Sequence, residues 1–181
     1  MLKKFLTLCC CFLFAGGVAV AQESSFSVES SSFKNNETMP LKYAYNSGRC
    51  TGLGENISPE LHWNNAPEGT KSFAVVSHDP DAPVQNGWYH WFLINIPASQ
   101  NSLPEGVKPA NGMKEIKNSF GILPYGGPCP PSGTHRYNFT VYALSVKSLD
   151  MDIDTNPVIA EKIIKENALA GATITGLFSA R

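Results

Sequence analysis

The sequence predicts an all-β domain with a minor helix, namely an antiparallel Greek-key β-sandwich that carries one short helix near its C-terminus. Its 181 residues include 15 Gly and 13 Pro but only 16% charged residues. Turns consume Gly and Pro, and long helices exclude Pro. Apolar side chains alternate with a period of two in several segments, whereas only one segment has helical spacing. An apolar content of 43% is enough for the core of one domain.

The predicted strands are short segments with period-two alternation. The best defined are rich in β-branched and aromatic residues and are bounded by Pro or Gly. No internal repeat or change in composition indicates a second domain. The predicted strands span residues 26–33, 57–63, 71–78, 88–96, 135–146 and 172–179.

One helix is predicted over residues 157–170. Asn156 is a residue type that caps helices, and the proline that follows it suits the first helical position. Glu161 and Lys165 are four residues apart, a spacing that favours an ion pair on a helix surface. Gly171 is expected to end the helix.

Residues 1–21 resemble a cleaved signal peptide. Two lysines precede an apolar run, and Ala19-Val20-Ala21 matches a signal-peptidase site before Gln22. The mature chain would be a single domain over residues 22–181, exported to the periplasm or secreted. A membrane anchor and a lipoprotein modified at Cys9–Cys11 are the alternatives. Removing two lysines leaves 12 basic and 15 acidic residues, a net charge of −3 that argues against nucleic-acid binding.

Cys50 and Cys129 are the two cysteines left after cleavage. In an oxidising compartment, an even number of cysteines usually forms disulfides. The expected pairing is therefore Cys50 with Cys129. Two buried thiols are the alternative, and a redox-active cysteine is less favoured because no C-x-x-C spacing is present.

Two loops between the predicted strands carry chemical information. Residues 78–83 read His-Asp-Pro-Asp-Ala-Pro, which places two carboxylates in a stiff turn. Residues 125–131 read Tyr-Gly-Gly-Pro-Cys-Pro-Pro, and His135-Arg136-Tyr137 follows shortly after. Proline fixes the backbone of such loops, so they lose little entropy when a ligand binds. This pattern is typical of a binding site.

These motifs, together with Trp88-Tyr89-His90, resemble the phosphatidylethanolamine-binding protein family, specifically its bacterial Raf-kinase-inhibitor-like branch. The resemblance runs from about Phe26 to the C-terminus. It implies an antiparallel β-sandwich with a small pocket that holds phosphate, acetate or a phospholipid head group. Most family members are described as binders and as regulators of kinases, proteases or signalling, and not as enzymes.

The resemblance also implies which residues form the pocket. Cys129 stands where eukaryotic relatives place a glycine, which fits the disulfide. The implied ligand-binding residues are Asp79, Asp81, Pro83, His90, Gly127, His135 and Tyr137.

Strand alternation places His135 and Tyr137 on one face, and it places His90 with Trp88, Phe92 and Ile94. We expect the two histidines to contact the anion. Asp79 and Asp81 would bind loop N–H groups, orient histidine rings or pair with Arg136. If a charged imidazole attracts the ligand, affinity for a phosphate monoester should rise as the pH falls through about 6.5.

The predicted function is that of an exported, non-enzymatic protein that binds a small anion and regulates or inhibits a partner such as a protease or kinase. No cofactor, metal or nucleic acid is expected, and the family resemblance is compatible with a homodimer. One alternative is a protease inhibitor that acts through exposed loops. Another is a metal-dependent hydrolase that uses Asp79, Asp81, His90 and His135.

Overall fold

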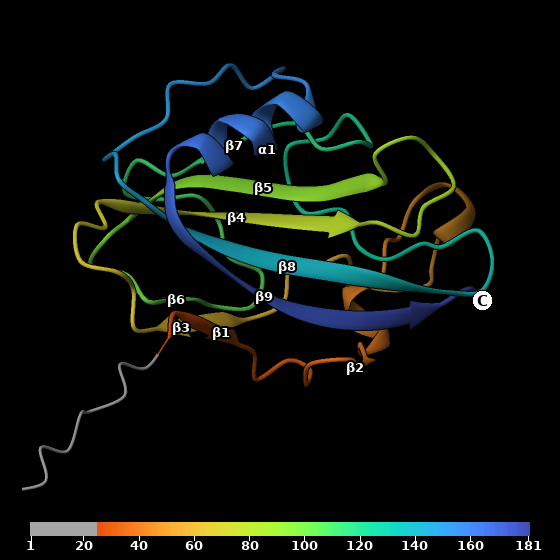
Figure 1. Ribbon diagram of the computed structural model, residues 1–181. Coiled ribbons are helices and arrows are strands. Elements are labelled where there is room, and N and C mark those ends of the chain that lie inside the picture. Colours follow the sequence, from red (N-terminus) through yellow and green to blue (C-terminus); the bar gives the residue numbers. More distant parts are fainter. Residues whose placement is uncertain (1–24) are drawn as a thin grey trace, which may run out of the picture.

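The computed structural model describes residues 25–181. These residues form two β-sheets and one α-helix (Figure 1). The predicted signal peptide over residues 1–21 lies outside the described residues. Helix α1 covers one face of the larger sheet, and the smaller sheet lies against the other face (Figure 1). The predicted class, mostly β with a minor helix, is confirmed.

The larger sheet has six strands in the order β2-β9-β8-β4-β5-β7. The long strand β4 pairs antiparallel with β5 on one side and with β8 on the other. Strand β8 in turn pairs antiparallel with β9. The strands are β2 (Glu37–Thr38), β4 (Ser72–Asp79), β5 (Trp88–Pro97), β7 (Lys114–Glu115), β8 (Thr134–Leu144) and β9 (Ala168–Ser179).

The smaller sheet has three strands in the order β1-β3-β6, paired antiparallel. They are β1 (Ser27–Glu29), β3 (Leu61–Asn64) and β6 (Ser102–Leu103). Two single-turn 3₁₀-helices, η1 (Leu41–Tyr43) and η2 (Gly48–Cys50), lie in the segment between β2 and β3.

Two of the predicted strands are shorter than expected. The segment predicted over 26–33 forms a strand only over Ser27–Glu29, because the serines that follow bond to Glu60 instead of to a neighbouring strand. Serine side chains compete in this way with sheet ladders. The segment predicted over 57–63 pairs only from Leu61, after a proline that has no N–H to donate.

One strand pair departs from the predicted antiparallel arrangement. Glu37–Thr38 runs parallel to β9, opposite Gly176 and Leu177. The N–H of Met39 then donates to the carbonyl of Leu177 at 2.8 Å. The two strands are far apart in the sequence, so no hairpin dictates their relative direction.

The large sheet has an apolar core on each face. Successive side chains of a strand point to opposite faces, so each strand contributes apolar residues to both cores. Between the two sheets, Trp63 of β3 packs on Phe73 of β4, with ring centroids 5.1 Å apart. On the opposite face, Val76 and Phe92 belong to a second cluster with Ile164 of α1. The helix therefore completes a third layer.

Helix α1 begins as predicted but ends earlier. It spans Pro157–Glu166, and Asn156 accepts a cap hydrogen bond from the N–H of Val158. The prediction that it extends to residue 170 is wrong, because Ala168 and Ala170 pair with β8 as the first part of β9. Sheet pairing overrides the helical preference of alanine here. Within residues 25–181, no helix has the length and apolar character needed to cross a bilayer.

The helix layer can be tested with a matched pair of substitutions. Ile164 is fully buried against the sheet, whereas Ile159 on the same helix is 53% exposed. Ile164→Ala should lower the free energy of unfolding by about 2–4 kcal/mol, because it leaves a cavity in the core. Ile159→Ala should change it by less than about 0.5 kcal/mol. Urea denaturation measures both, and equal effects would contradict the assigned packing.

Candidate functional site

The predicted site residues lie at one end of the large sheet. Antiparallel pairing sets Asp79, the last residue of β4, opposite Trp88, the first residue of β5. The same pairing sets His78 of β4 opposite Asn138, close to the start of β8. Three strand ends, and the loops that leave them, therefore meet at this end of the sheet.

A cavity of about 240 Å³ opens between these loops. Four predicted site residues line it, namely Asp79, Pro83, His90 and Tyr137. The predicted residues Asp81, Gly127 and His135 are not among its lining residues. The other lining residues are Arg49, Ala82, Val84, Trp88, Phe120, Cys129, Pro130 and Pro131.

His90 enters the cavity because of a β-bulge. Ser77 of β4 pairs with Trp91, while the next residue, His78, pairs with Tyr89, so His90 has no partner on β4. Such an extra residue bends the strand and changes the direction of its side chain. The prediction that His90 shares a face with Phe92 and Ile94 is therefore wrong, because those two residues belong to the helix-side core.

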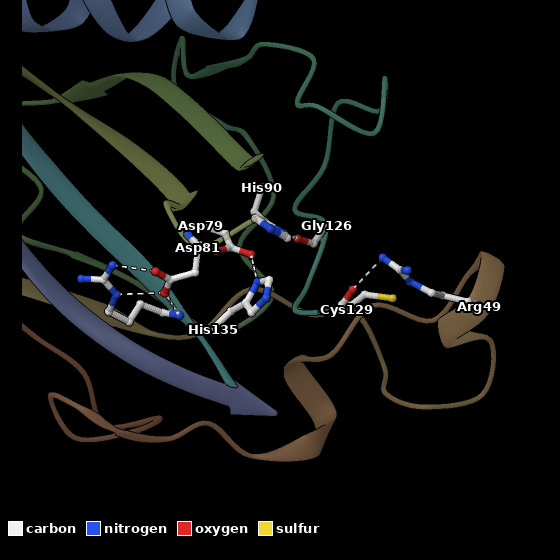
Figure 2. A network of polar contacts seen from close by, with 8 residues as sticks. Arg49, Asp79, Asp81, His90, Gly126, Cys129 and His135 are labelled. Carbon is white, nitrogen blue, oxygen red and sulfur yellow. Dashed lines mark hydrogen bonds and ion pairs between the residues drawn. The ribbon is translucent and has the colours of Figure 1, made fainter. Parts of the chain in front are cut away.

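The His90 ring packs against aromatic side chains and is fixed in one tautomer. Its centroid lies 5.0 Å from that of Tyr137 and 5.4 Å from that of Phe120. Its Nδ1–H donates to the carbonyl of Gly126 at 2.6 Å (Figure 2), which leaves Nε2 as a hydrogen-bond acceptor. Burial lowers the pKa of His90 to about 4. The hypothesis that a charged imidazole attracts the ligand near pH 6.5 therefore does not fit His90.

His135 and Asp79 form a buried pair. The Nδ1–H of His135 donates to Oδ2 of Asp79 at 2.7 Å, and the other Asp79 oxygen accepts the backbone N–H of Asp81 at 2.8 Å (Figure 2). The two side chains are 8% and 4% exposed. These are the contacts expected of a carboxylate that orients a ring and holds a loop. Here Asp79 lines the cavity and His135 supports it from outside.

Asp81 bonds to Arg136, outside the cavity lining. The Nη2 and Nε groups of Arg136 donate to the two carboxylate oxygens at 2.6 and 2.9 Å, and its backbone N–H donates as well (Figure 2). The Arg136 guanidinium lowers the pKa of Asp81 to about 2. This interaction links the loop after β4 to the start of β8.

Gly127 has a packing role. Its N–H donates to Oδ1 of Asn56 at 2.7 Å. A Cβ at this position would collide with the carbonyl of Tyr43, so only glycine allows the loop to approach that backbone so closely.

Two buried donors at the cavity have no hydrogen-bond partner among the described residues, namely the Tyr137 hydroxyl and Nε1–H of Trp88. Burial raises the pKa of Tyr137, and the nearby carboxylate of Asp79 adds to the increase, so the hydroxyl keeps its proton. Unpaired buried donors are rare because each costs about 1–3 kcal/mol. Both donors belong to residues that line the cavity.

Sequence reasoning did not assign Arg49 or Phe120 to the site. Arg49 precedes Cys50, which the structure joins to Cys129 in the cavity wall with Cα atoms 6.1 Å apart. Because Cys129 belongs to one of the predicted site loops, its predicted pairing with Cys50 could have indicated that the neighbouring Arg49 lies near the site. Phe120 lies in the turn from Asn118 to Gly121, and nothing in the sequence indicated that this turn reaches the cavity.

No group of three or more metal-ligating side chains, His, Cys, Asp or Glu, comes together within residues 25–181. Of the four residues considered for a metal, Asp79 and His135 bond to each other, whereas Asp81 bonds to Arg136 and His90 to Gly126.

A family model described as phosphatidylethanolamine-binding protein matches residues 29–179. UPF0098 protein YbcL of Escherichia coli is 37% identical over 166 residues, covering 87% of this chain and 90% of YbcL. The crystal structure of YbcL, described as a new member of the mammalian PEBP family, matches with a TM-score of 0.82 at 36% identity and covers 87% of this chain and 100% of that chain.

Two further relatives cover most of the chain. UPF0098 protein YbhB of Escherichia coli is 38% identical over 156 residues, covering 83% of this chain and 98% of YbhB. LppC of Mycobacterium tuberculosis, whose name describes a lipoprotein, is 34% identical over 153 residues, covering 83% of this chain and 71% of LppC.

The titration of His90 can be measured directly. Its midpoint should lie near pH 4, because burial disfavours the charged ring. Between about pH 6.5 and pH 4 the unfolded chain binds a proton that the folded protein does not. The free energy of unfolding should therefore decrease as the pH is lowered through this window. NMR titration of the imidazole resonances tests this. His62, whose pKa is raised by Glu60, is the internal control, and a His90 midpoint near 6.5 would refute the assignment.

Proposed function

The chain belongs to the phosphatidylethanolamine-binding protein family, and we propose that it is a non-enzymatic protein whose cavity binds a small anionic ligand, either phosphate or a phospholipid head group. The observation that carries this proposal is the pair of unpartnered donors, the Tyr137 hydroxyl and Nε1–H of Trp88, at the cavity. An oxyanion would accept both hydrogen bonds and remove the cost of leaving two buried donors unpaired.

The acceptors in the cavity restrict the ligand further. His90 presents an unprotonated Nε2, and Asp79 presents a carboxylate whose oxygens already accept hydrogen bonds. A ligand that also carries a donor, such as a protonated phosphate or an ammonium group, would pair with the imidazole. Apolar walls formed by Phe120, Pro130 and Pro131 suit the short carbon chain of a head group. A volume of about 240 Å³ suits a ligand of this size.

The lining residues support binding and not catalysis. They include no serine, threonine or lysine, and their one cysteine is joined to Cys50. Serine, threonine, lysine and cysteine are the usual nucleophiles that act beside a base. The carboxylate of Asp79 could also act as one, but both of its oxygens already accept hydrogen bonds, from His135 and from the N–H of Asp81. A metal-dependent hydrolase would first have to break the Asp79–His135 and Asp81–Arg136 contacts, which disfavours that alternative.

Export forms part of the same proposal. Lys3 and Lys4 precede an apolar run, and small residues stand before Gln22. The LppC relative, whose name describes a lipoprotein, agrees with a location outside the cytoplasm. The disulfide would also be favoured there. N-terminal sequencing of protein recovered from the periplasm or medium should read from Gln22, and an intact N-terminus would contradict cleavage.

Tyr137→Phe tests the binding proposal. Removing the hydroxyl should weaken binding of inorganic phosphate and phosphoethanolamine about tenfold, because a hydrogen bond to a charged group is lost. Folding stability should fall little, since the hydroxyl donates no hydrogen bond within the described residues. Isothermal titration calorimetry measures the affinities, and thermal denaturation measures the stability.

Tyr125→Phe is the matched control, because the Tyr125 hydroxyl donates to the carbonyl of Tyr43 outside this cavity. It should leave both affinities unchanged. If the wild-type protein binds neither probe, the proposed function is wrong. An inhibitor that acts on a protease or kinase through exposed loops would instead keep its inhibition in Tyr137→Phe.

A further inference from the structure

Arg49 is the one residue with a full positive charge among the described residues that line the cavity. It lies on η2, whereas the other polar lining groups come from strands β4, β5 and β8. Its Nη2 group donates to the carbonyl of Cys129 at 3.3 Å (Figure 2). The next residue, Cys50, is joined to Cys129 by the disulfide. The side chain is exposed and stands at the cavity mouth.

We propose that Arg49 determines the specificity of the cavity for phosphorylated ligands, and that the Cys50–Cys129 bridge positions it. This inference rests on the proposed function and names the residue that distinguishes a phosphate from an uncharged or cationic ligand.

The charges inside the cavity make such a cation necessary. His90 is neutral, Tyr137 and Trp88 are neutral donors, and Asp79 carries a carboxylate. His135 is paired with Asp79, so it can offset the charge of that carboxylate but adds no further positive charge for a ligand. Arg136 lies outside the lining and is bonded to Asp81. Without Arg49, the cavity offers hydrogen bonds to an anion but no net attraction.

The guanidinium also suits phosphate by its shape. Its planar arrangement of donors matches two phosphate oxygens at once, which an ammonium group cannot do. Its field reaches the interior: although burial is the main influence and raises the pKa of Tyr137, the charge of Arg49 opposes that increase. A phosphate held by the Tyr137 hydroxyl would therefore feel the same charge.

The bridge acts mainly on Arg49, since other contacts hold the neighbouring backbone. The N–H of Tyr45 donates to the carbonyl of Pro128 at 3.0 Å, and Asn56 bonds to Gly127 at 2.7 Å. The rest of the loop over residues 125–131 thus stays packed if the bridge is absent. The 3₁₀ turn that carries Arg49 would lose its covalent link to the cavity wall.

Arg49→Gln and Arg49→Lys test the inference by calorimetry with inorganic phosphate, phosphoethanolamine and ethanolamine. Arg49→Gln should weaken binding of the two phosphorylated probes about tenfold, and Arg49→Lys should weaken it less, because the charge remains but the paired donors are lost. Binding of ethanolamine should not weaken. The loss should shrink in about 1 M salt, which screens charges at an exposed mouth.

Lys147→Gln is the matched control, because it removes the same charge from an exposed site beyond the opposite end of β8. It should leave all affinities unchanged. The double variant Cys50→Ser/Cys129→Ser should lose phosphate affinity to a similar extent, and adding Arg49→Gln to it should cause little further loss. A serine variant that folds and keeps the wild-type phosphate affinity would overturn the positioning role of the bridge. If the serine variant fails to fold, titration of the wild-type protein with the bridge reduced tests that role instead, and the two Arg49 variants still decide the specificity.

The outcomes separate the two proposals. Wild-type binding of phosphate that Arg49→Gln leaves unchanged would overturn this inference and spare the proposed function. A wild-type protein that binds neither phosphorylated probe would overturn both.

Discussion

The buried hydrogen bond between Asp79 and His135 is the interaction on which the arrangement of the site depends. It joins the end of β4 to the start of β8, and the second oxygen of Asp79 holds the backbone of Asp81. Asp81 is thereby placed for its paired bonds with Arg136. Removing one member of a buried pair leaves an uncompensated polar group, so both residues are needed to keep the strand ends and their loops in register.

The β-bulge opposite Ser77 and His78 is the second constraint. A regular strand would direct His90 toward the helix-side core, where Phe92 and Ile94 pack. The extra residue directs the imidazole into the cavity instead, and the carbonyl of Gly126 then selects its tautomer. One local irregularity in the backbone therefore decides both the place of His90 and its role as an acceptor.

Period-two patterns and turn residues were enough to predict the long strands and the start of α1, because these depend on local propensity and capping. The end of α1 could not be predicted, since Ala168 leaves the helix only through pairing with β8. In the site, the family resemblance implied Asp79, Pro83, His90 and Tyr137, which line the cavity. The bulge has no local signature, and Arg49 reaches the cavity through a covalent link across 79 positions of sequence.

The distribution of charge in the cavity follows from the cost of burying ions. A buried guanidinium would lose much of its hydration, whereas Arg49 at the mouth stays solvated and still acts on the interior. The deeper positions hold the neutral groups Trp88, His90 and Tyr137, whose hydrogen bonds select shape and protonation state at lower desolvation cost. The buried carboxylate among the lining residues, that of Asp79, is paired with His135. Arg49 at the mouth thus attracts the anion, whereas the deeper groups select the shape and protonation state of the ligand. A relative could therefore lose the rim cation and keep the same fold and interior while it binds a ligand of different charge.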